Sequence, residues 1–184
     1  MRLFVAIDLP SNIKEKLANI QARLKEANAG VRFVSPEGIH LTLKFLGEVA
    51  EDRVGKVIEA LAENVPRISP FNLKVEGLGA FPSISRPRVV WAGVKAPDEL
   101  LTLAEEIEKA MVKLGFPKEE RDFSPHLTLC RIKSPQGIDR LIKIVMEEKD
   151  ISLGEFTADG YFLIQSILRP EGARYIKIRR FNLF

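Results

Sequence analysis

The sequence predicts an α+β fold built from two related lobes, and three observations support this prediction. Strand-like and helix-like patterns of apolar residues alternate along the 184 residues. One order of elements (helix, loop, strand, helix and two strands) occurs in residues 1–95 and again in 96–184. Each half has the tetrapeptide His-Leu-Thr-Leu in its first long strand after the helix. We therefore expect a single domain whose halves pack about a pseudo-two-fold axis, with these strands facing each other across a cleft.

The first half begins with residues 2–8, which read as a buried strand. Ser11 is the expected N-cap of a helix with an apolar stripe, and Gly30 is expected to end it. The remaining expected elements are an extended segment, a turn, a strand, a helix and two strands, at 31–34, 35–38, 39–49, 51–64, 71–78 and 87–94.

The second half repeats this order. Asp98 is the expected cap of a helix that ends at Gly115. A strand and a further helix follow, and two long strands are joined by Arg169-Pro170-Glu171-Gly172, a favourable tight-turn sequence. These last four elements are expected at 124–133, 138–147, 155–168 and 173–182.

The composition is typical of a globular protein without staples or membrane spans. Hydrophobic residues make up 46% of the chain, and the formal net charge is only +3, a mild preference for anionic partners. Cys130 is the single cysteine, so neither an internal disulfide nor a thiolate metal cluster is expected. With no signal-peptide pattern at the N-terminus and no long apolar run, we expect a cytoplasmic protein without membrane contact.

The two histidines of the chain both lie in the repeated tetrapeptide, as His40-Leu41-Thr42-Leu43 and His126-Leu127-Thr128-Leu129. Strand side chains alternate between faces, so each histidine and the threonine two residues later should face the cleft together. A threonine hydroxyl can donate a hydrogen bond to a phosphate oxygen. An imidazole exchanges protons near neutral pH, so two such pairs suit acid–base cleavage of a phosphodiester.

Other chemistries find less support in the sequence. Two histidines without a cysteine cluster fall short of a catalytic zinc site, and no HExxH spacing is present. Acidic residues do not cluster beside the motifs, so we expect no metal. The GxGxxG and GxxxxGK[ST] nucleotide-binding motifs are also missing, and we expect no cofactor.

The paired motifs, the opening MRLFVAIDLP and the segments HLTLKFLGEV and SPHLTLCRIK resemble the two-histidine (2H) phosphoesterase superfamily. The resemblance spans essentially the whole chain and is greatest to the RNA 2′,3′-cyclic phosphodiesterases, also called 2′-5′ RNA ligases. It implies antiparallel sheets that line a central cleft, with helices outside. It also implies hydrolysis of a terminal 2′,3′-cyclic phosphate to a 2′-phosphate without ATP or metal, and 2′-5′ ligation when an RNA 5′-OH replaces water.

The resemblance assigns roles to matching residues. His40 and His126 become the catalytic pair, with His126 as the base and His40 as the acid, although the pseudo-symmetry makes the two nearly interchangeable in sequence. Thr42 and Thr128 would hold the phosphate. Arg131 matches an arginine that neutralises the phosphate in this family. Strict alternation places Arg131 on the opposite face of the strand, unless a bulge turns its side chain inward.

Further residues are candidates for substrate contact. Phe4 and Phe45 could stack on a base, although both suit the core better. Lys44 has the parity to follow Thr42 into the cleft, and a solvated lysine is equally consistent with the sequence. Several arginines on the later strands could line an RNA path: Arg86, Arg88, Arg169, Arg174, Arg179 and Arg180.

Three functions compete at this point. The first is an RNA end-processing enzyme for 2′,3′-cyclic phosphate ends, such as tRNA-like fragments. The second is a phosphodiesterase for a small cyclic nucleotide or an ADP-ribose cyclic phosphate. The third is a binding module without turnover, which has no need of two titrating histidines. We expect a monomer, because no amphipathic seam is left over.

Overall fold

The strands form two antiparallel sheets, described here from a computed structural model of residues 1–184. One sheet has the order β3-β1-β8-β9 and the other the order β2-β6-β5-β4-β7. The strands are β1 (Arg2–Ile7), β2 (Val31–Phe33), β3 (Leu41–Glu48), β4 (Phe71–Pro82), β5 (Pro87–Lys95), β6 (His126–Ile132), β7 (Ser152–Ala158), β8 (Gly160–Ile167) and β9 (Arg174–Asn182). The predicted α+β class with antiparallel sheets is confirmed.

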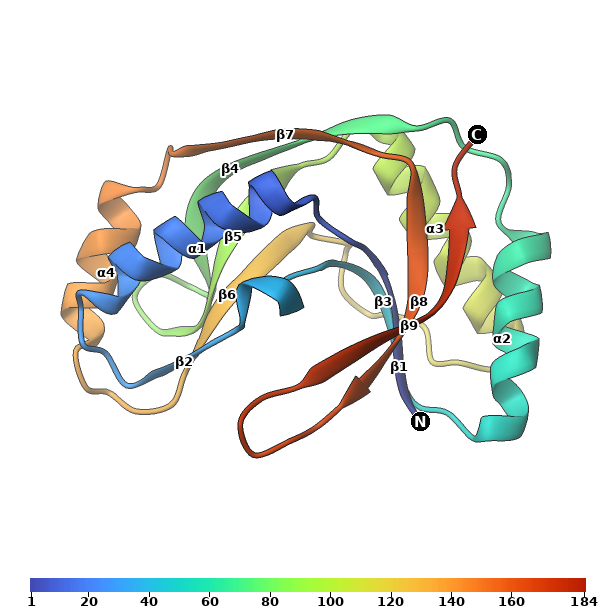
Figure 1. Ribbon diagram of the computed structural model, residues 1–184, viewed down its shortest axis with the longest axis horizontal. Helices are drawn as coiled ribbons and strands as arrows, with labels where there is room; N and C mark the ends of the chain where they lie inside the picture. Colours follow the sequence, from blue (N-terminus) through green and yellow to red (C-terminus); the bar gives the residue numbers. More distant parts are fainter.

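The helices lie at the two ends of the molecule, outside the sheets (Figure 1). Helices α1 and α4 contact each other and pack against β7 and β4 of the five-stranded sheet. Helices α2 and α3 contact each other and pack against β9 and β3 of the four-stranded sheet. Their bounds are α1 (Ser11–Lys25), α2 (Glu51–Asn64), α3 (Asp98–Lys113) and α4 (Ile138–Glu147), with a short 3₁₀ helix, η1 (Pro36–Gly38).

Each sheet contains strands from both halves of the sequence. The hairpin β4–β5 of the first half pairs with β6, the second motif strand. The hairpin β8–β9 of the second half pairs with β1, which is bonded to β3, the first motif strand. A contiguous core of 43 buried residues includes apolar side chains of both sheets and all four α-helices. The two motif strands are therefore supported by hairpins that belong to the opposite half of the chain.

Some boundaries differ from the expectations. Ser11 and Asp98 are the first residues of their helices rather than the caps. Pro10 and Pro97 occupy the cap positions, where their carbonyls accept the first helical N–H groups. Helix α1 ends before Gly30, and Asn28 adopts a positive φ of 46° in the turn that follows. Gly115 does follow α3 and has a φ of 87°, as a helix-ending glycine should.

The expected long strand 155–168 is wrong, because the chain changes sheets in its middle. Strand β7 pairs with β4 of the five-stranded sheet, and β8 pairs with β1 and β9 of the other. The break lies at Asp159-Gly160. A Cβ atom on Gly160 would lie 2.7 Å from the carbonyl oxygen of Phe181, so only glycine fits this crossing. The expected turn at 169–172 is present, with the Gly172 N–H donating to the Arg169 carbonyl.

Candidate active site

His40 stands between η1 and β3, against two aromatic rings. Its ring meets Tyr175 of β9 edge-on at 4.9 Å between centroids, and Phe4 of β1 at 5.7 Å. The carbonyl of Gly38, two residues upstream, accepts a hydrogen bond from the imidazole. The ring is therefore oriented by one backbone contact and by packing from two strands of the four-stranded sheet.

The environment of His40 favours its neutral form. Burial lowers the pKa of His40 from 6.5 to about 4. The nearby carboxylate of Asp8 acts in the opposite direction, but it is itself bound by the ammonium groups of Lys14 and Lys177. Those two cations add to the effect of burial on His40. At neutral pH, His40 is therefore an uncharged imidazole.

The lowered pKa of His40 can be tested by an NMR titration of the histidine rings. The chain has only two histidines, so their ring signals can be assigned with one substitution. We expect the His40 signal to titrate near pH 4. Tyr175→Ala should raise that midpoint, because removing the ring admits water and weakens the desolvation. A His40 midpoint near 6.5 in the wild-type protein would contradict the buried environment described above.

His126 is the first residue of β6 and is held by a similar contact. Its Nδ1 lies 2.6 Å from the carbonyl oxygen of Ser124, again two residues upstream. A carbonyl can only accept a hydrogen bond, so Nδ1 must carry the proton and Nε2 is left free. The Phe81 ring of β4 meets the imidazole edge-on at 4.9 Å between centroids. Each motif histidine thus has an upstream carbonyl and an aromatic neighbour from its own sheet.

The first motif strand contains one extra residue directly after the threonine. Val5 of β1 faces Lys44, whereas Ala6 faces Thr42, so Leu43 has no partner of its own. Leu43 and Lys44 are both buried as a result, and alternation resumes one residue late. Phe45 therefore has a side chain that is 65% exposed and lines the cleft. The expectations that Phe45 belongs to the core and that Lys44 points into the cleft are both wrong.

The second motif strand has a bulge at the same place. Val90 of β5 faces Cys130 and Trp91 faces Thr128, so Leu129 is the extra residue. Buried Gln21 of α1 donates a hydrogen bond of 3.0 Å to the Leu129 carbonyl. The bulge turns Arg131 to the side of Thr128, and both residues line the cleft. This is the bulge that the expectation for Arg131 required.

The side chain of Lys44 links the first motif to the segment that leads into the second. Its ammonium lies 2.7 Å from the carboxylate of Glu108 on α3 and donates to the Pro117 carbonyl at 3.0 Å. Glu108 also accepts a hydrogen bond from the Glu119 N–H at 2.8 Å. Only 5% of the Lys44 side chain is exposed. Lys44 therefore has a structural contact, and neither of the two positions that the sequence left open for it, the cleft or the solvent, is correct.

A cleft of about 1070 Å³ collects most of the predicted site residues. Its walls include His40, Thr42, Thr128, Arg131, Phe4 and Phe45. Tyr175, which no sequence signal indicated, also lines it. His126 is not among the lining residues, but it lies on β6 two residues from Thr128, and β6 contacts β3. The structure therefore brings the two threonines, one histidine and Arg131 into one cavity, with the second histidine next to it.

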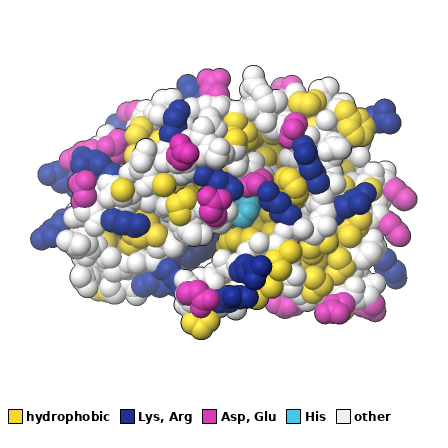
Figure 2. Space-filling model, in the orientation of Figure 1, with side chains coloured by type: hydrophobic (Ala, Val, Ile, Leu, Met, Phe, Trp, Pro, Cys, Tyr) yellow, Lys and Arg dark blue, Asp and Glu magenta, His cyan; other side chains and the backbone are white.

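Seven Lys or Arg side chains line this cleft, against two glutamates. Figure 2 shows a histidine in a hollow near the middle of the face, with Lys and Arg side chains around it. Of the arginines named from the sequence, Arg169 and Arg174 line the cleft, and Arg86, Arg88, Arg179 and Arg180 do not. The sequence reading missed four cations of the lining: Arg2, Lys25, Arg32 and Lys133.

The structure also bears on metal binding, membrane spans and the single cysteine. Histidine, cysteine and acidic side chains do not gather in any group of three or more that could hold a metal ion. None of the helices has the length and apolar character needed to cross a membrane. Cys130 is free and buried, and burial raises the pKa of its thiol to about 12.

Comparison with known proteins shows the family to which this chain belongs. The sequence model of the family described as LigT-like phosphoesterase matches residues 7–91 and again residues 93–175. The chain therefore belongs to this family of 2H phosphoesterases, as the resemblance implied.

Relatives and solved structures extend the similarity over the whole chain. An RNA 2′,3′-cyclic phosphodiesterase of Archaeoglobus fulgidus is 42% identical over 99% of this chain and 100% of its own length. The RNA 2′,3′-cyclic phosphodiesterase of Methanothermobacter thermautotrophicus is 35% identical over 100% of this chain and 99% of its own length. A crystal structure from Thermus thermophilus superimposes with a TM-score of 0.84, 30% identity and coverage of 100% and 98%. The crystal structure of Escherichia coli LigT complexed with 3′-AMP superimposes with a TM-score of 0.79 and 28% identity. The match covers 99% of this chain and 97% of that one.

Proposed function

We propose that this chain hydrolyses the terminal 2′,3′-cyclic phosphate of RNA to a 2′-phosphate by acid–base catalysis. Its full-length relatives carry the name RNA 2′,3′-cyclic phosphodiesterase. The observation that carries the proposal is the paired arrangement of the motifs. Each histidine is held through an upstream carbonyl, and both threonines line one cleft rich in cations. Such a cleft suits a phosphodiester anion, for which the two imidazoles supply proton transfer.

In the proposed reaction, His126 takes a proton from water at its free Nε2 while the water oxygen attacks phosphorus. The bond from phosphorus to O3′ breaks, and His40 gives its proton to O3′, leaving a 2′-phosphate. Thr42 and Thr128 donate hydrogen bonds to non-bridging oxygens, and Arg131 offsets their charge. The anionic substrate raises the pKa of His40, because a nearby negative charge stabilises the imidazolium. His40 therefore becomes a competent acid when the cleft is filled.

The same geometry supports the reverse type of chemistry. If the 5′-OH of a second RNA replaces water, His126 takes the proton of that hydroxyl and the oxygen attacks phosphorus. O3′ leaves with the proton of His40, and a 2′-5′ phosphodiester forms. Neither reaction consumes ATP, because the cyclic phosphate supplies the bond that breaks.

Phe45 is the proposed stacking platform for the terminal base. Its ring is exposed in the cleft, whereas Phe4 is only 4% exposed and lies behind it, with ring centroids 5.9 Å apart. We expect Phe45→Ala to raise KM by roughly tenfold, within the range of about 1–3 kcal/mol for stacking of one base. Steady-state kinetics check this, with Phe45→Tyr retaining most of the affinity. An unchanged KM in Phe45→Ala would remove the stacking role.

The duplication, the cellular location and the oligomeric state belong to the same proposal. The family matches residues 7–91 and 93–175 separately, which supports two diverged halves of one domain. We propose a monomer, which analytical ultracentrifugation can test. We also propose that the enzyme works in the cytoplasm, where a single buried and free Cys130 is well suited to reducing conditions.

Turnover of a defined RNA tests the proposed function directly. The substrate is an oligonucleotide that ends in a 2′,3′-cyclic phosphate, incubated with the protein in EDTA and without ATP. We expect complete conversion to the 2′-phosphate, identified by its resistance to a 3′-specific phosphatase and by ³¹P NMR. Absence of conversion by the folded protein, or formation of a 3′-phosphate, would overturn the proposal.

A further inference from the structure

Two arginines lie side by side on neighbouring strands at the edge of the five-stranded sheet. Arg32 of β2 is the direct cross-strand partner of Arg131 of β6. Side chains of directly opposed residues project from the same face, with Cβ atoms about 5 Å apart, and like charges at such positions repel. Both arginines line the cleft, and neither forms an ion pair with a carboxylate. A bound anion would relieve this repulsion.

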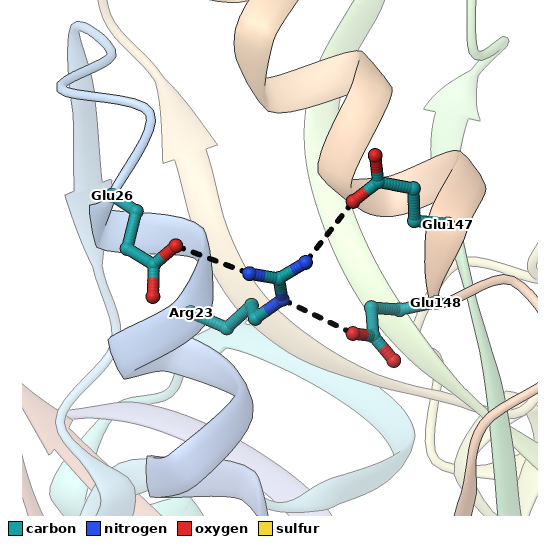
Figure 3. Close-up of polar contacts among 4 residues, drawn as sticks. All are labelled: Arg23, Glu26, Glu147 and Glu148. Atoms are coloured by element: carbon teal, nitrogen blue, oxygen red, sulfur yellow. Dashed lines mark hydrogen bonds and ion pairs between the residues drawn. The ribbon is translucent and has the colours of Figure 1, made fainter.

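Two cations on the outer surface show what carboxylate partners do for such a charge. Arg23 is the clearest contrast (Figure 3), because its guanidinium contacts Glu26, Glu147 and Glu148 at 3.1, 3.1 and 3.2 Å. Lys109 similarly contacts Glu105 and Glu106. Arg32 and Arg131 differ from these two cations, because each lines the cleft without an ion pair to a carboxylate.

A hydrogen bond fixes the Arg32 side chain against the opposite wall of the cleft. Its Nη2 donates to the carbonyl of Pro170, in the turn between β8 and β9, at 2.9 Å. This contact brings the turn of one sheet to the edge strand of the other. Arg169 and Arg174, at either end of this turn, also line the cleft. The cations of this part of the lining therefore come from both sheets.

The position of this cluster relative to the motif suggests its ligand. Thr128 and Arg131 lie three positions apart along β6, a distance of about 7–10 Å. Lys133 follows directly after the end of β6 and also lines the cleft. The strand thus leads from the proposed site of the cyclic phosphate to the Arg32 cluster. An anion held by Arg32 would therefore lie on the far side of Arg131 from the two motif threonines.

We propose that Arg32 binds a second phosphate of the substrate, the phosphodiester on the 5′ side of the terminal nucleotide, with Arg174 and Lys133 near it. The inference rests on the proposed function and adds a substrate requirement to it. A guanidinium matches two phosphate oxygens at once, so Arg32 can form a bidentate contact. A mononucleotide 2′,3′-cyclic phosphate lacks this second phosphate. The cleft therefore selects RNA chains of at least two nucleotides.

A cycle of two changes tests the contact. The protein is changed by Arg32→Gln, and the substrate is a dinucleotide with a terminal 2′,3′-cyclic phosphate whose internal linkage is either a phosphodiester or a neutral methylphosphonate. We expect each change alone to lower kcat/KM by about tenfold, the order of a charged hydrogen bond. Together they should cost little more than either alone, because both remove the same contact. Fully multiplicative losses would overturn the proposal.

The control is Arg179→Gln, which removes the same charge from β9 at a position that does not line the cleft. This control should leave kcat/KM for the phosphodiester dinucleotide within twofold of wild type. Binding of the uncleavable 2′-phosphate product, followed by fluorescence anisotropy, gives a second readout. Arg32→Gln should reduce the slope of log K against log salt by about one, and Arg179→Gln should not. Equal slopes in the two variants would contradict a phosphate contact at Arg32.

Comparison with a nucleoside 2′,3′-cyclic monophosphate separates this inference from the proposed function. We expect wild type to turn over both substrates, with the dinucleotide favoured by about tenfold and the preference reduced in Arg32→Gln. Turnover of both without any preference would overturn the second phosphate site and leave the proposed reaction intact. Turnover of neither substrate would overturn the proposed function itself.

Discussion

Replacing either motif histidine by alanine is expected to lower kcat for RNA 2′,3′-cyclic phosphate hydrolysis by roughly 10²- to 10⁴-fold. His40→Ala removes the proton donor to O3′, and His126→Ala removes the acceptor for the proton of water. The two groups act in one step, so the kcat of the double variant should be only slightly lower than that of the less active single variant. Single-turnover rates at saturating enzyme measure this loss without the complication of product release.

A folded and binding-competent protein is the necessary control for these variants. Both should bind the 2′-phosphate product with affinity close to wild type, because Thr42, Thr128 and Arg131 are intact. Their kcat should also lose the bell-shaped pH dependence that an acid–base pair gives. Full activity in either variant would contradict the proposed mechanism. Loss of activity together with loss of product binding would instead indicate a role in positioning the phosphate.

His40 also predicts a link between stability and pH. Its pKa is about 4 in the folded protein and near 6.5 in the unfolded chain, so the unfolded chain binds more protons between these values. The free energy of unfolding should therefore fall as the pH falls from about 6.5 to 4, by at most about 3 kcal/mol. Urea unfolding at several pH values, compared with His40→Gln, isolates this contribution. The variant should lose part of the dependence on pH.

The motif residues show which parts of the site were accessible from sequence. Alternation along a strand correctly placed Thr42 and Thr128 in the cleft, because it operates over two residues. It failed for Lys44 and Phe45, since the extra residue at Leu43 depends on the pairing between β3 and β1. That register is a property of two strands, and one strand's sequence does not contain it. Arg131 was placed only because the resemblance required a bulge.

The exchange of hairpins between the halves was inaccessible for a similar reason. Local patterns predicted most strands and helices, yet they contain no information on which strand pairs with which. The crossing between β7 and β8 did leave a signal, the Asp159-Gly160 pair inside an apolar segment, which is typical of a turn. Arg32 had no such signal, because its importance arises from its position opposite Arg131.

Lys44→Met is expected to lower the free energy of unfolding by about 2–4 kcal/mol, because it leaves the carboxylate of Glu108 without its partner in a largely buried place. The Glu108 side chain is 23% exposed, so water offsets part of this cost. The Pro117 carbonyl also loses its donor. Urea denaturation measures the change. The double variant Lys44→Met/Glu108→Leu should recover much of the stability, since it removes the lone charge.

Lys109, an exposed lysine next to Glu108 on α3, provides the matched control for this prediction. Lys109 contacts Glu105 and Glu106, but 53% of its side chain is exposed, so Lys109→Met should lower the free energy of unfolding far less than Lys44→Met. The contact of Lys44 also holds the segment that leads to the second motif, which the Lys109 contacts do not touch. Pro117 and Glu119 belong to this segment, which continues to Ser124 and His126. Lys44→Met should therefore lower kcat under conditions where the variant is folded. Equal stabilities of the Lys44 and Lys109 variants, with unchanged kcat in both, would show that this contact neither stabilises the fold nor positions the second motif.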